Sequence, residues 1–325
     1  MDKIYKNLLI VDGSYMMHRA GHTPAFQELV TSKGIKSGMM YGFMKILNYE
    51  MYQDSTMGFP VVCWDAGLSD RRVSVYPEYK ANRHHDGDSE DEYIQEYRRQ
   101  RSDVISALSK MGIPSVIIKG WEGDDLIKIL TMMSSHSVVL SDDKDMVQLV
   151  SESVTLRRPM QKETLLFDSI SDDLRHPRYT ITKSIVGDPS DNIPQVSAGV
   201  GWKTADTVAE VISEYSLDEM KGKLIEYKDS CTKKSIKNKC ESLINDWDKF
   251  IVNYKLINLD YVEDDVTDEL LDEVKSQVLL GSSGVNMLEC YKIFSDYEIT
   301  SMSPDTMFAA SLARKSNLYV GDNNG

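Results

Sequence analysis

The chain has 325 residues, of which 41% are hydrophobic, and this is enough for one large or two ordinary domains. No stretch approaches the ~18 continuous apolar residues of a membrane span, and the N-terminus lacks a small-residue cleavage site, so we expect a cytoplasmic protein, or one in the host cytoplasm if a phage encodes it. The net charge of −14 alone argues against a nucleic-acid partner, although residues 221–239 hold seven lysines and bound metal ions would offset acidic ligands.

The first half of the sequence alternates apolar runs with helical patterns. Four runs are predicted to be buried strands, namely residues 7–12, 60–65, 113–119 and 137–141. Helical spacing separates them, over residues 37–51, 91–111 and 121–133. Strands that alternate with helices are typical of a parallel sheet covered on both faces. We therefore predict an α/β fold with a mostly parallel central sheet.

Acidic side chains follow every one of these predicted strands. In chain order they are Asp12, Asp65, the group Glu122, Asp124 and Asp125, and the group Asp142, Asp143 and Asp145. Open α/β sheets bind ligands beyond the carboxyl ends of their strands. Carboxylates are hard oxygen ligands, so this cluster favours Mg²⁺ or Mn²⁺ over zinc. The alternative is an acidic surface, with Glu122 and Asp125 only stabilising the start of a helix.

The second half of the sequence has a different character. Residues 184–215 begin as a helix, pass through a segment rich in Gly, Pro and Asn, and become helical again from Thr204. The sequence GVGWKT (199–204) predicts a turn that opens a helix, where free backbone N–H groups suit a phosphate. An acidic pair, Asp188 and Asp191, lies just upstream. Residues 236–260 look helical, and residues 316–325 are predicted to be a loose tail.

These segments together resemble the 5′ nuclease family, which includes flap endonucleases, bacteriophage 5′ exonucleases and the nuclease domain of bacterial DNA polymerase I. The resemblance covers roughly residues 6–215 and follows the family's order. It is carried by VDGSYMMHRA (11–20), TSKG (31–34), YGFMKIL (41–47), WDAGLSDRRVSVYPEYKANR (64–83), GWEGDDLIKIL (120–130), LSDDKDMVQLV (140–150) and VGDPSDNIPQVSAGVGWKTA (186–205). Residues 252–262 also resemble the stand-alone phage ribonuclease H.

The resemblance implies a domain organisation. A PIN-like nuclease domain would span residues 1–180, with a helical arch near residues 77–101. A helical region of the helix–hairpin–helix type would follow over residues 181–260 and bind duplex DNA. Residues 261–325 would form a C-terminal helical extension that ends in the loose tail.

The resemblance also implies two divalent cations, Mg²⁺ with Mn²⁺ as a substitute. The ligands nearest the first would be Asp12, Asp65, Glu122, Asp124 and Asp125. Those nearest the second would be Asp143, Asp145, Asp188 and Asp191. Asp142 falls outside the family pattern, and we expect it to be a solvated charge or a group outside the ligand set.

Cations for the phosphate are implied as well. Lys80 and Arg83 match the start of the arch and Arg72 matches an upstream arginine, where they would stabilise charge on the transferred phosphate; the alternative is a solvated basic surface. The residues expected to contact DNA are Arg19, Arg71, Gly199, Gly201, Lys203 and Thr204. The family hairpin holds K⁺ in several relatives. Here Gln195 replaces its first glycine and one residue is inserted, so that K⁺ site stays an open question.

The predicted function is that of a metal-dependent, structure-specific 5′ nuclease in DNA replication or repair. As a 5′-3′ exonuclease or flap endonuclease, it would cut near single-strand/duplex junctions and remove RNA primers. Its partners would be DNA with a 5′ flap or nick, RNA–DNA hybrid and a single-strand binding protein, and we expect a monomer. Two alternatives stay open: a PIN-class single-strand endoribonuclease without the duplex-binding hairpin, and a catalytically silent DNA-junction binder.

Overall fold

The computed structural model describes residues 2–53, 58–82 and 91–319. Within them six strands form one sheet in the order β3-β2-β1-β4-β5-β6. These are β1 (Tyr5–Asp12), β2 (Phe59–Cys63), β3 (Ser115–Val116), β4 (Ser134–Leu140), β5 (Val154–Arg158) and β6 (Glu163–Leu165). Every pairing is parallel except that of β5 with β6. The prediction of an α/β fold with a mostly parallel sheet is confirmed.

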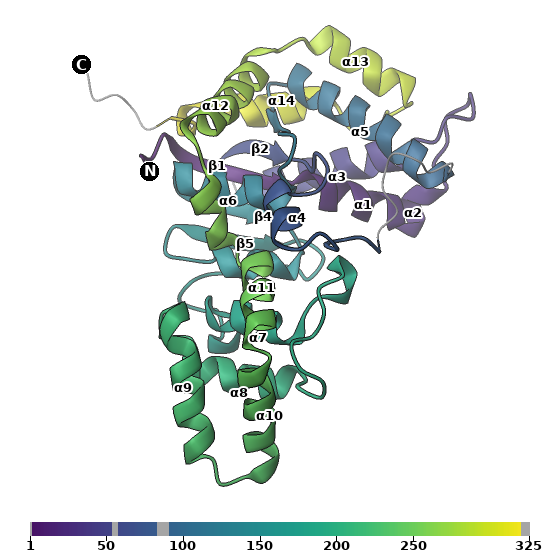
Figure 1. Cartoon of the computed structure of the whole chain (residues 1–325). Helices are drawn as coiled ribbons and strands as arrows, with labels where there is room; N and C mark the ends of the chain where they lie inside the picture. The colour runs from purple at the N-terminus through teal and green to yellow at the C-terminus, as the bar shows by residue number, and fades with distance from the viewer. Residues whose placement is uncertain (1, 54–57, 83–90, 320–325) are drawn as a thin grey trace, which may run out of the picture.

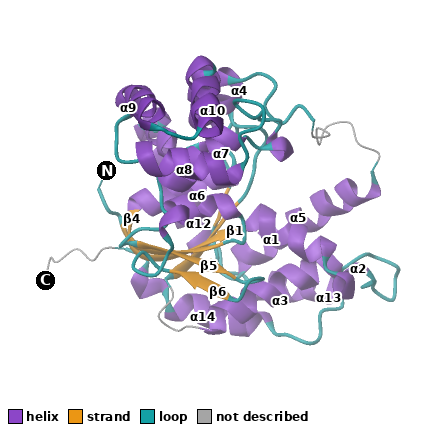
Figure 2. Ribbon diagram, turned by 90° about the horizontal axis from the view of Figure 1, so that it is seen from below, coloured by secondary structure: helices purple, strands orange, loops and turns teal. Residues whose placement is uncertain are grey.

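Helices cover both faces of the sheet because its central strands are apolar on both sides (Figures 1 and 2). In β1, Leu8 and Ile10 enter one hydrophobic core while Leu9 and Val11 enter the other. The first core is closed by α6 (Gly123–Met133) and α12 (Asp268–Ser283). The second is closed by α1 (Gly13–His22), α3 (Gly38–Gln53), α5 (Glu92–Lys110), α13 (Met287–Asp296) and α14 (Pro304–Ala313).

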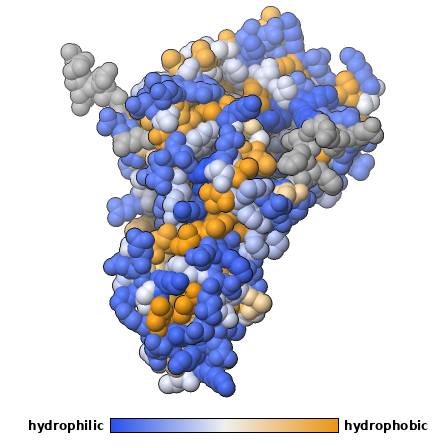
Figure 3. Space-filling model, viewed as in Figure 1, coloured by the Kyte–Doolittle hydropathy of each residue, from blue (hydrophilic) through white to orange (hydrophobic). Residues whose placement is uncertain are grey.

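A second lobe, made of helices, lies below the sheet in Figure 1. It consists of α7 (Arg178–Val186), α8 (Trp202–Ile212), α9 (Leu217–Ser230), α10 (Lys234–Asn245) and α11 (Trp247–Ile257). The lobe has its own core, which includes Ile181, Val208 and Phe250. Hydrophobic residues gather at the surface where the lobe meets the sheet (Figure 3), and Leu256 and Ile257 pack there with Tyr79.

Short elements complete the described chain. Two are α-helical, α2 (Pro24–Gln27) and α4 (Asp70–Val75). Five are 3-10 helices: η1 (Lys144–Leu149), η2 (Asp172–Leu174), η3 (Pro189–Asp191), η4 (Leu259–Asp265) and η5 (Lys315–Asn317). None of the helices among the described residues is both long and apolar enough to cross a bilayer.

Three details differ from the sequence-based prediction. The strand predicted over residues 113–119 is only Ser115–Val116, because the backbone N–H and carbonyl of Ile117 pair with the Gln277 side chain of α12. The prediction of a loose tail is wrong for Leu318, which is fully buried and whose carbonyl accepts a hydrogen bond from the Lys6 N–H. Residues 77–82 form turns rather than an arch helix, and residues 83–90, which include Arg83, lie outside the described residues.

Candidate active site

The carboxyl ends of β1, β2 and β4 bring the predicted acidic residues to one edge of the sheet. Asp12 is the last residue of β1, and its carboxylate accepts hydrogen bonds from the Tyr15 N–H at 2.9 Å and the Ser141 hydroxyl at 2.9 Å. Ser141 directly follows β4, so this contact ties two strand ends together. Asp65 follows β2 and accepts a hydrogen bond from the Gly123 N–H of α6 at 2.6 Å.

Three carboxylates at the start of α6 surround one buried arginine. Ligand oxygens of Glu122, Asp124 and Asp125 lie within 4.8 Å of one another. The Arg72 guanidinium contacts all three, at 2.8 Å, 3.0 Å and 3.0 Å respectively. Its Nε also donates to the Leu256 carbonyl at 3.0 Å, and the side chain is only 2% exposed. Arg72 is thus fixed among the carboxylates, and the predicted phosphate contact stays a prediction.

Tyr79 and Lys80 connect this group with the helical lobe. The Tyr79 hydroxyl lies 3.0 Å from Glu122 Oε2 and 3.2 Å from Asp191 Oδ2. Lys80 Nζ lies 2.8 Å from Glu122 Oε1 and 3.8 Å from Asp191 Oδ2. Lys80 has φ of +54°, in the left-handed region that non-glycine residues rarely adopt, while its N–H donates to the Asp191 carbonyl. Tyr79 was not among the predicted site residues, although it lies beside Lys80 in the sequence.

A second group of carboxylates surrounds Lys183 of α7. Lys183 Nζ contacts the Asp145 carboxylate and lies 2.8 Å from Asp188 Oδ2. Asp143 lies beside them, and its Oδ1 accepts a hydrogen bond from the Asp145 N–H at 2.8 Å. Lys183 was also not among the predicted site residues. Its position on the helix that leads into Asp188 was the feature of the sequence that could have indicated it.

Asp142 and Arg19 pair with each other beside the site. The Asp142 carboxylate accepts hydrogen bonds from the N–H groups of Met160 at 3.0 Å and Gln161 at 3.3 Å, in the turn between β5 and β6. Arg19 Nη1 lies 3.6 Å from it. Asp142 is therefore buried, so of the two alternatives the structure favours a group outside the ligand set over a solvated charge. Arg19, which is expected to contact DNA, forms an ion pair with this carboxylate.

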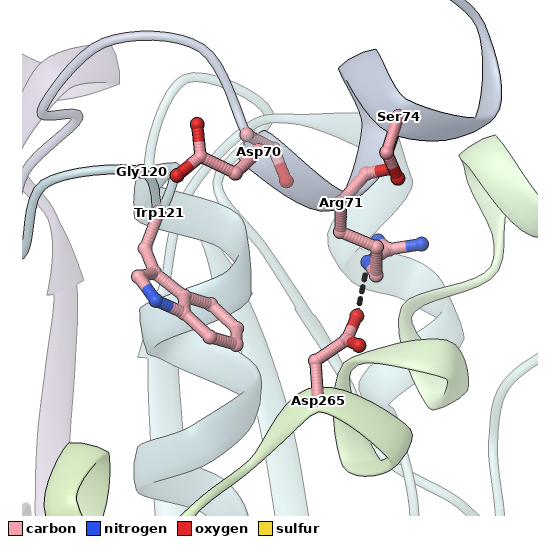
Figure 4. Close-up of a pocket in the computed structure, with 7 residues that line it drawn as sticks. Asp70, Arg71, Ser74, Gly120, Trp121 and Asp265 are labelled. Carbon is pink, nitrogen blue, oxygen red and sulfur yellow. Dashed lines mark hydrogen bonds and ion pairs between the residues drawn. The ribbon is translucent and has the colours of Figure 1, made fainter.

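Arg71 lies in a pocket lined by Asp70, Trp121 and Asp265 (Figure 4). Its Nη1 donates to the Lys255 carbonyl at 2.6 Å, and its Nε lies 3.7 Å from Asp265 Oδ2. Nη2 lies 3.6 Å from Asp125 Oδ1. The side chain is only 10% exposed. The packing of α4 on η4 and the end of α11 thus encloses most of the guanidinium, and the DNA contact expected of Arg71 stays a prediction.

The site carries more negative than positive charge. Burial, with further contributions from the nearby Asp65 and Asp143 charges, raises the pKa of Asp12 to about 8. Reduced hydration, together with the Asp145 charge, raises the pKa of Asp143 to about 6. Shifts in this direction mean that bringing these carboxylates together in ionised form is unfavourable without added cations. An all-oxygen donor set with uncompensated charge fits hard divalent cations.

These shifts predict how stability depends on pH when divalent metal is absent. A carboxyl group whose folded pKa is raised keeps a proton that the unfolded chain has released, so folding becomes less favourable as pH rises between the two pKa values. Asp12 should therefore lower the free energy of unfolding progressively from about pH 4 to about pH 8. Urea unfolding in EDTA should show Asp12→Asn gaining stability relative to wild type across this window. A difference that does not change with pH would contradict the assignment.

Comparison with known proteins gives matches in sequence and in fold. Residues 7–173 match the family model described as 5′-3′ exonuclease, N-terminal resolvase-like domain. A 5′-3′ exonuclease of Aquifex aeolicus is 32% identical over 210 residues, which are 62% of this chain and 68% of that protein. DNA polymerase I of Mycobacterium tuberculosis is 28% identical over 242 residues, which are 69% of this chain but only 25% of the polymerase.

Solved structures share the fold at low sequence identity. The T5 D15 protein co-crystallised with metal ions has a TM-score of 0.65 at 19% identity, covering 86% of this chain and 100% of that one. T5 5′-exonuclease with bound zinc has a TM-score of 0.64 at 21% identity, with the same coverage of both chains. The likeness in fold therefore extends beyond the matched N-terminal domain and includes at least part of the helical lobe.

Proposed function

We propose that this chain, which belongs to the 5′-3′ exonuclease family, is a Mg²⁺-dependent nuclease that hydrolyses phosphodiester bonds near single-strand/duplex junctions. The observation that carries the proposal is the convergence of nine acidic residues, from both lobes, on one edge of the sheet. The described cations that contact them there, Arg71, Arg72, Lys80 and Lys183, are fewer than the carboxylates. A silent DNA binder would gain nothing from such mutually repelling carboxylates. The residues around Arg72 and Lys183 would then hold the divalent cations.

We assign the two ligand groups as the family resemblance implies. Asp12, Asp65, Glu122, Asp124 and Asp125 would serve the first cation, and Asp143, Asp145, Asp188 and Asp191 the second. When bound, Mg²⁺ or Mn²⁺ would supply Lewis acidity for the attacking water and charge stabilisation for the leaving oxygen. The protein's own part is to hold these oxygens in place. Arg72 donates to the Leu256 carbonyl and so holds the carboxylates of the first group in place. Lys183 contacts both Asp145 and Asp188 of the second group.

We propose that residues 1–180 form the nuclease domain and that residues 181–260 bind duplex DNA. The hairpin before α8 supports this, because a Cβ atom added at Gly199 or Gly201 would meet no described atom within 4 Å. Gly199 has φ of +78°, and Gly201 caps α8, so a phosphate can approach the free N–H groups of the first helical turn. Lys239 of α10 donates to the Thr204 hydroxyl at 3.2 Å and adds a cation beside this turn.

Trp202 is a further candidate DNA contact, one that the sequence analysis missed. It is 41% exposed at the start of α8, with Lys144 Nζ 5.7 Å from its ring centroid. Its ring lies 5.8 Å from that of Tyr179, whose hydroxyl lies 3.4 Å from Asp145 Oδ1. The indole thus lies between the hairpin and the second group of carboxylates. An exposed aromatic face in this position suits an unpaired base at a junction.

We expect Trp202→Ala to weaken binding of a 5′-flap duplex about 5- to 100-fold, which corresponds to ~1–3 kcal/mol for one stacked base. Tyr215→Ala is the matched control, because Tyr215 follows the other end of α8, is 39% exposed and has Lys223 Nζ 5.1 Å from its ring. Fluorescence anisotropy with labelled DNA in EDTA measures binding without cleavage. Equal losses for the two variants would contradict a specific role of Trp202.

Cleavage assays with a Mg²⁺ titration test the proposed function. A labelled 5′ flap, a nicked duplex, an RNA–DNA hybrid and an unstructured RNA are incubated with the protein, and the products are mapped. We expect cutting at the junction that needs Mg²⁺, and removal of the RNA strand from the hybrid. Cleavage of only the unstructured RNA would favour the PIN-class endoribonuclease, and no cleavage of any substrate would favour the silent binder.

We also propose that the protein acts as a monomer and that a single-strand binding protein is a partner. Sedimentation of the protein alone tests the first proposal. Co-sedimentation with a single-strand binding protein, with and without flap DNA, tests the second.

A further inference from the structure

The hairpin between α7 and α8 differs from the family pattern at Gln195, where relatives have a glycine, and by one inserted residue. In this structure the Gln195 side chain turns back into the hairpin. Its amide Nε2 donates to the carbonyl of Val200 at 2.5 Å. Val200 is fully buried and immediately precedes Gly201, which caps α8. A side-chain amide thus binds a backbone oxygen at the tip of the DNA-binding hairpin.

A second side-chain amide binds the other strand of the same hairpin. Asn253 of α11 is buried, and its Nδ2 donates to the carbonyls of Pro194 at 2.7 Å and Ser184 at 2.9 Å. The neighbouring Ile193 carbonyl accepts a hydrogen bond from the Asp188 N–H at 2.9 Å. Carbonyl oxygens on both sides of the hairpin tip are therefore already paired with N–H groups of the protein.

The hydroxyl of Ser197 is also engaged elsewhere. Its Oγ donates to Asp246 Oδ2 at 2.7 Å, which ties the hairpin to the start of α11. The Ser197 carbonyl accepts the Val200 N–H at 3.4 Å. The hairpin thus holds its shape through hydrogen bonds from Gln195, Asn253 and its own backbone.

A potassium ion in a backbone loop needs several carbonyl oxygens that converge and replace its hydration shell. An amide N–H points the positive end of its dipole at a carbonyl and occupies one of the two lone pairs of that oxygen without any ion. A cation placed on that oxygen as well would face the partly positive amide hydrogens. The oxygens around Gln195 therefore do not fit the potassium site that the family resemblance implies.

We propose that the Gln195 amide takes the place of potassium, so that this hairpin keeps its DNA-binding shape without a monovalent cation. This rests on the proposed function only in taking the hairpin as a duplex-binding element. Because the amide is covalently part of the chain, duplex binding would depend on the ionic strength of the solution but not on which monovalent cation is present.

The test compares potassium, sodium and choline chloride at one ionic strength, with EDTA present. The Tm of the full chain is measured without DNA, and duplex affinity is measured by anisotropy. For the wild type we expect the same Tm and the same affinity in all three salts. A Tm that is higher in potassium than in choline chloride, with tighter duplex binding, would overturn the proposal. Because the Tm measurement contains neither DNA nor divalent metal, its result does not depend on whether the protein is a nuclease.

The variant Gln195→Glu removes the N–H donor at nearly constant shape and adds a carboxylate oxygen beside the Val200 carbonyl. We expect its Tm to fall in choline chloride and to recover in part in potassium chloride. Gln95→Glu, at an exposed position of α5, is the matched control for the added charge. If Gln195→Glu behaves like Gln95→Glu in every salt, the amide is not a structural substitute for an ion. The wild-type comparison stands on its own even if Gln195→Glu does not fold.

Discussion

Asp143→Asn should lower Mg²⁺-dependent cleavage of a 5′-flap duplex by at least about 100-fold, because removing one group from a preorganised charged site typically costs 10²–10³ in rate. The substitution keeps the shape of the side chain and one acceptor for the Asp145 N–H, which Asp143 Oδ1 now accepts at 2.8 Å. Duplex binding, measured in EDTA, should change only a few-fold. Asp65→Asn should give the same pattern, since Asp65 also lies at a strand end.

Asp142→Asn is the matched control, one residue away in the sequence. The Asp142 carboxylate binds the N–H groups of Met160 and Gln161, so an asparagine oxygen can still accept one of these bonds. Cleavage per folded molecule should therefore stay close to that of wild type. Asp142→Ala should instead destabilise the protein by about 1–3 kcal/mol, the range for leaving buried polar groups unpaired. A loss of cleavage in Asp142→Asn as large as in Asp143→Asn would show that the assignment chose the wrong carboxylate.

The cluster of acidic residues at one edge of the sheet was predictable because the sequence patterns that indicate it are local. Parallel strands end at the same side, so acidic residues after Val11, Trp64 and Leu140 must come together there. Short sequence patterns, each a few residues long, predict the apolar strands, the turn after each strand and the helices between them. The short strands β5 and β6, on the side of the sheet beyond β4, were missed because neither forms a long apolar run.

The roles of the cations were not predictable in the same way. Arg71 and Arg72 are adjacent and look alike in sequence, yet both are buried because α4 packs against carbonyls of Lys255 and Leu256, far along the chain. Lys183 looks like an ordinary helix lysine until the fold places Asp145 and Asp188 on either side of it. A charged side chain shows whether it faces solvent or a carboxylate only once the lobes are packed.

Lys80→Met should lower the single-turnover cleavage rate about 10²- to 10³-fold, the usual effect of losing a positioned charge at a reacting phosphate. Lys80 bonds to Glu122 at 2.8 Å and is 3.8 Å from Asp191, so its ammonium lies between the two groups of carboxylates. Burial lowers the pKa of Lys80, but the Glu122 and Asp191 charges more than reverse this and leave it above the ordinary value. The lysine is thus a permanent cation near pH 7 and not a general base.

Lys128→Met is the control that separates an effect on catalysis from the loss of an ion pair made by a mostly buried lysine. Lys128 is 12% exposed, close to the 14% of Lys80, and its Nζ lies 2.9 Å from both Asp260 and Glu263, away from the carboxylate cluster. Both substitutions should reduce stability, whereas only Lys80→Met should slow cleavage at saturating DNA. Because the Lys80 charge does not titrate near neutrality, the pH dependence of the remaining activity should keep its shape. If Lys80→Met changes the DNA affinity but not the saturated rate, then its ammonium binds the strand without acting on the reacting phosphate.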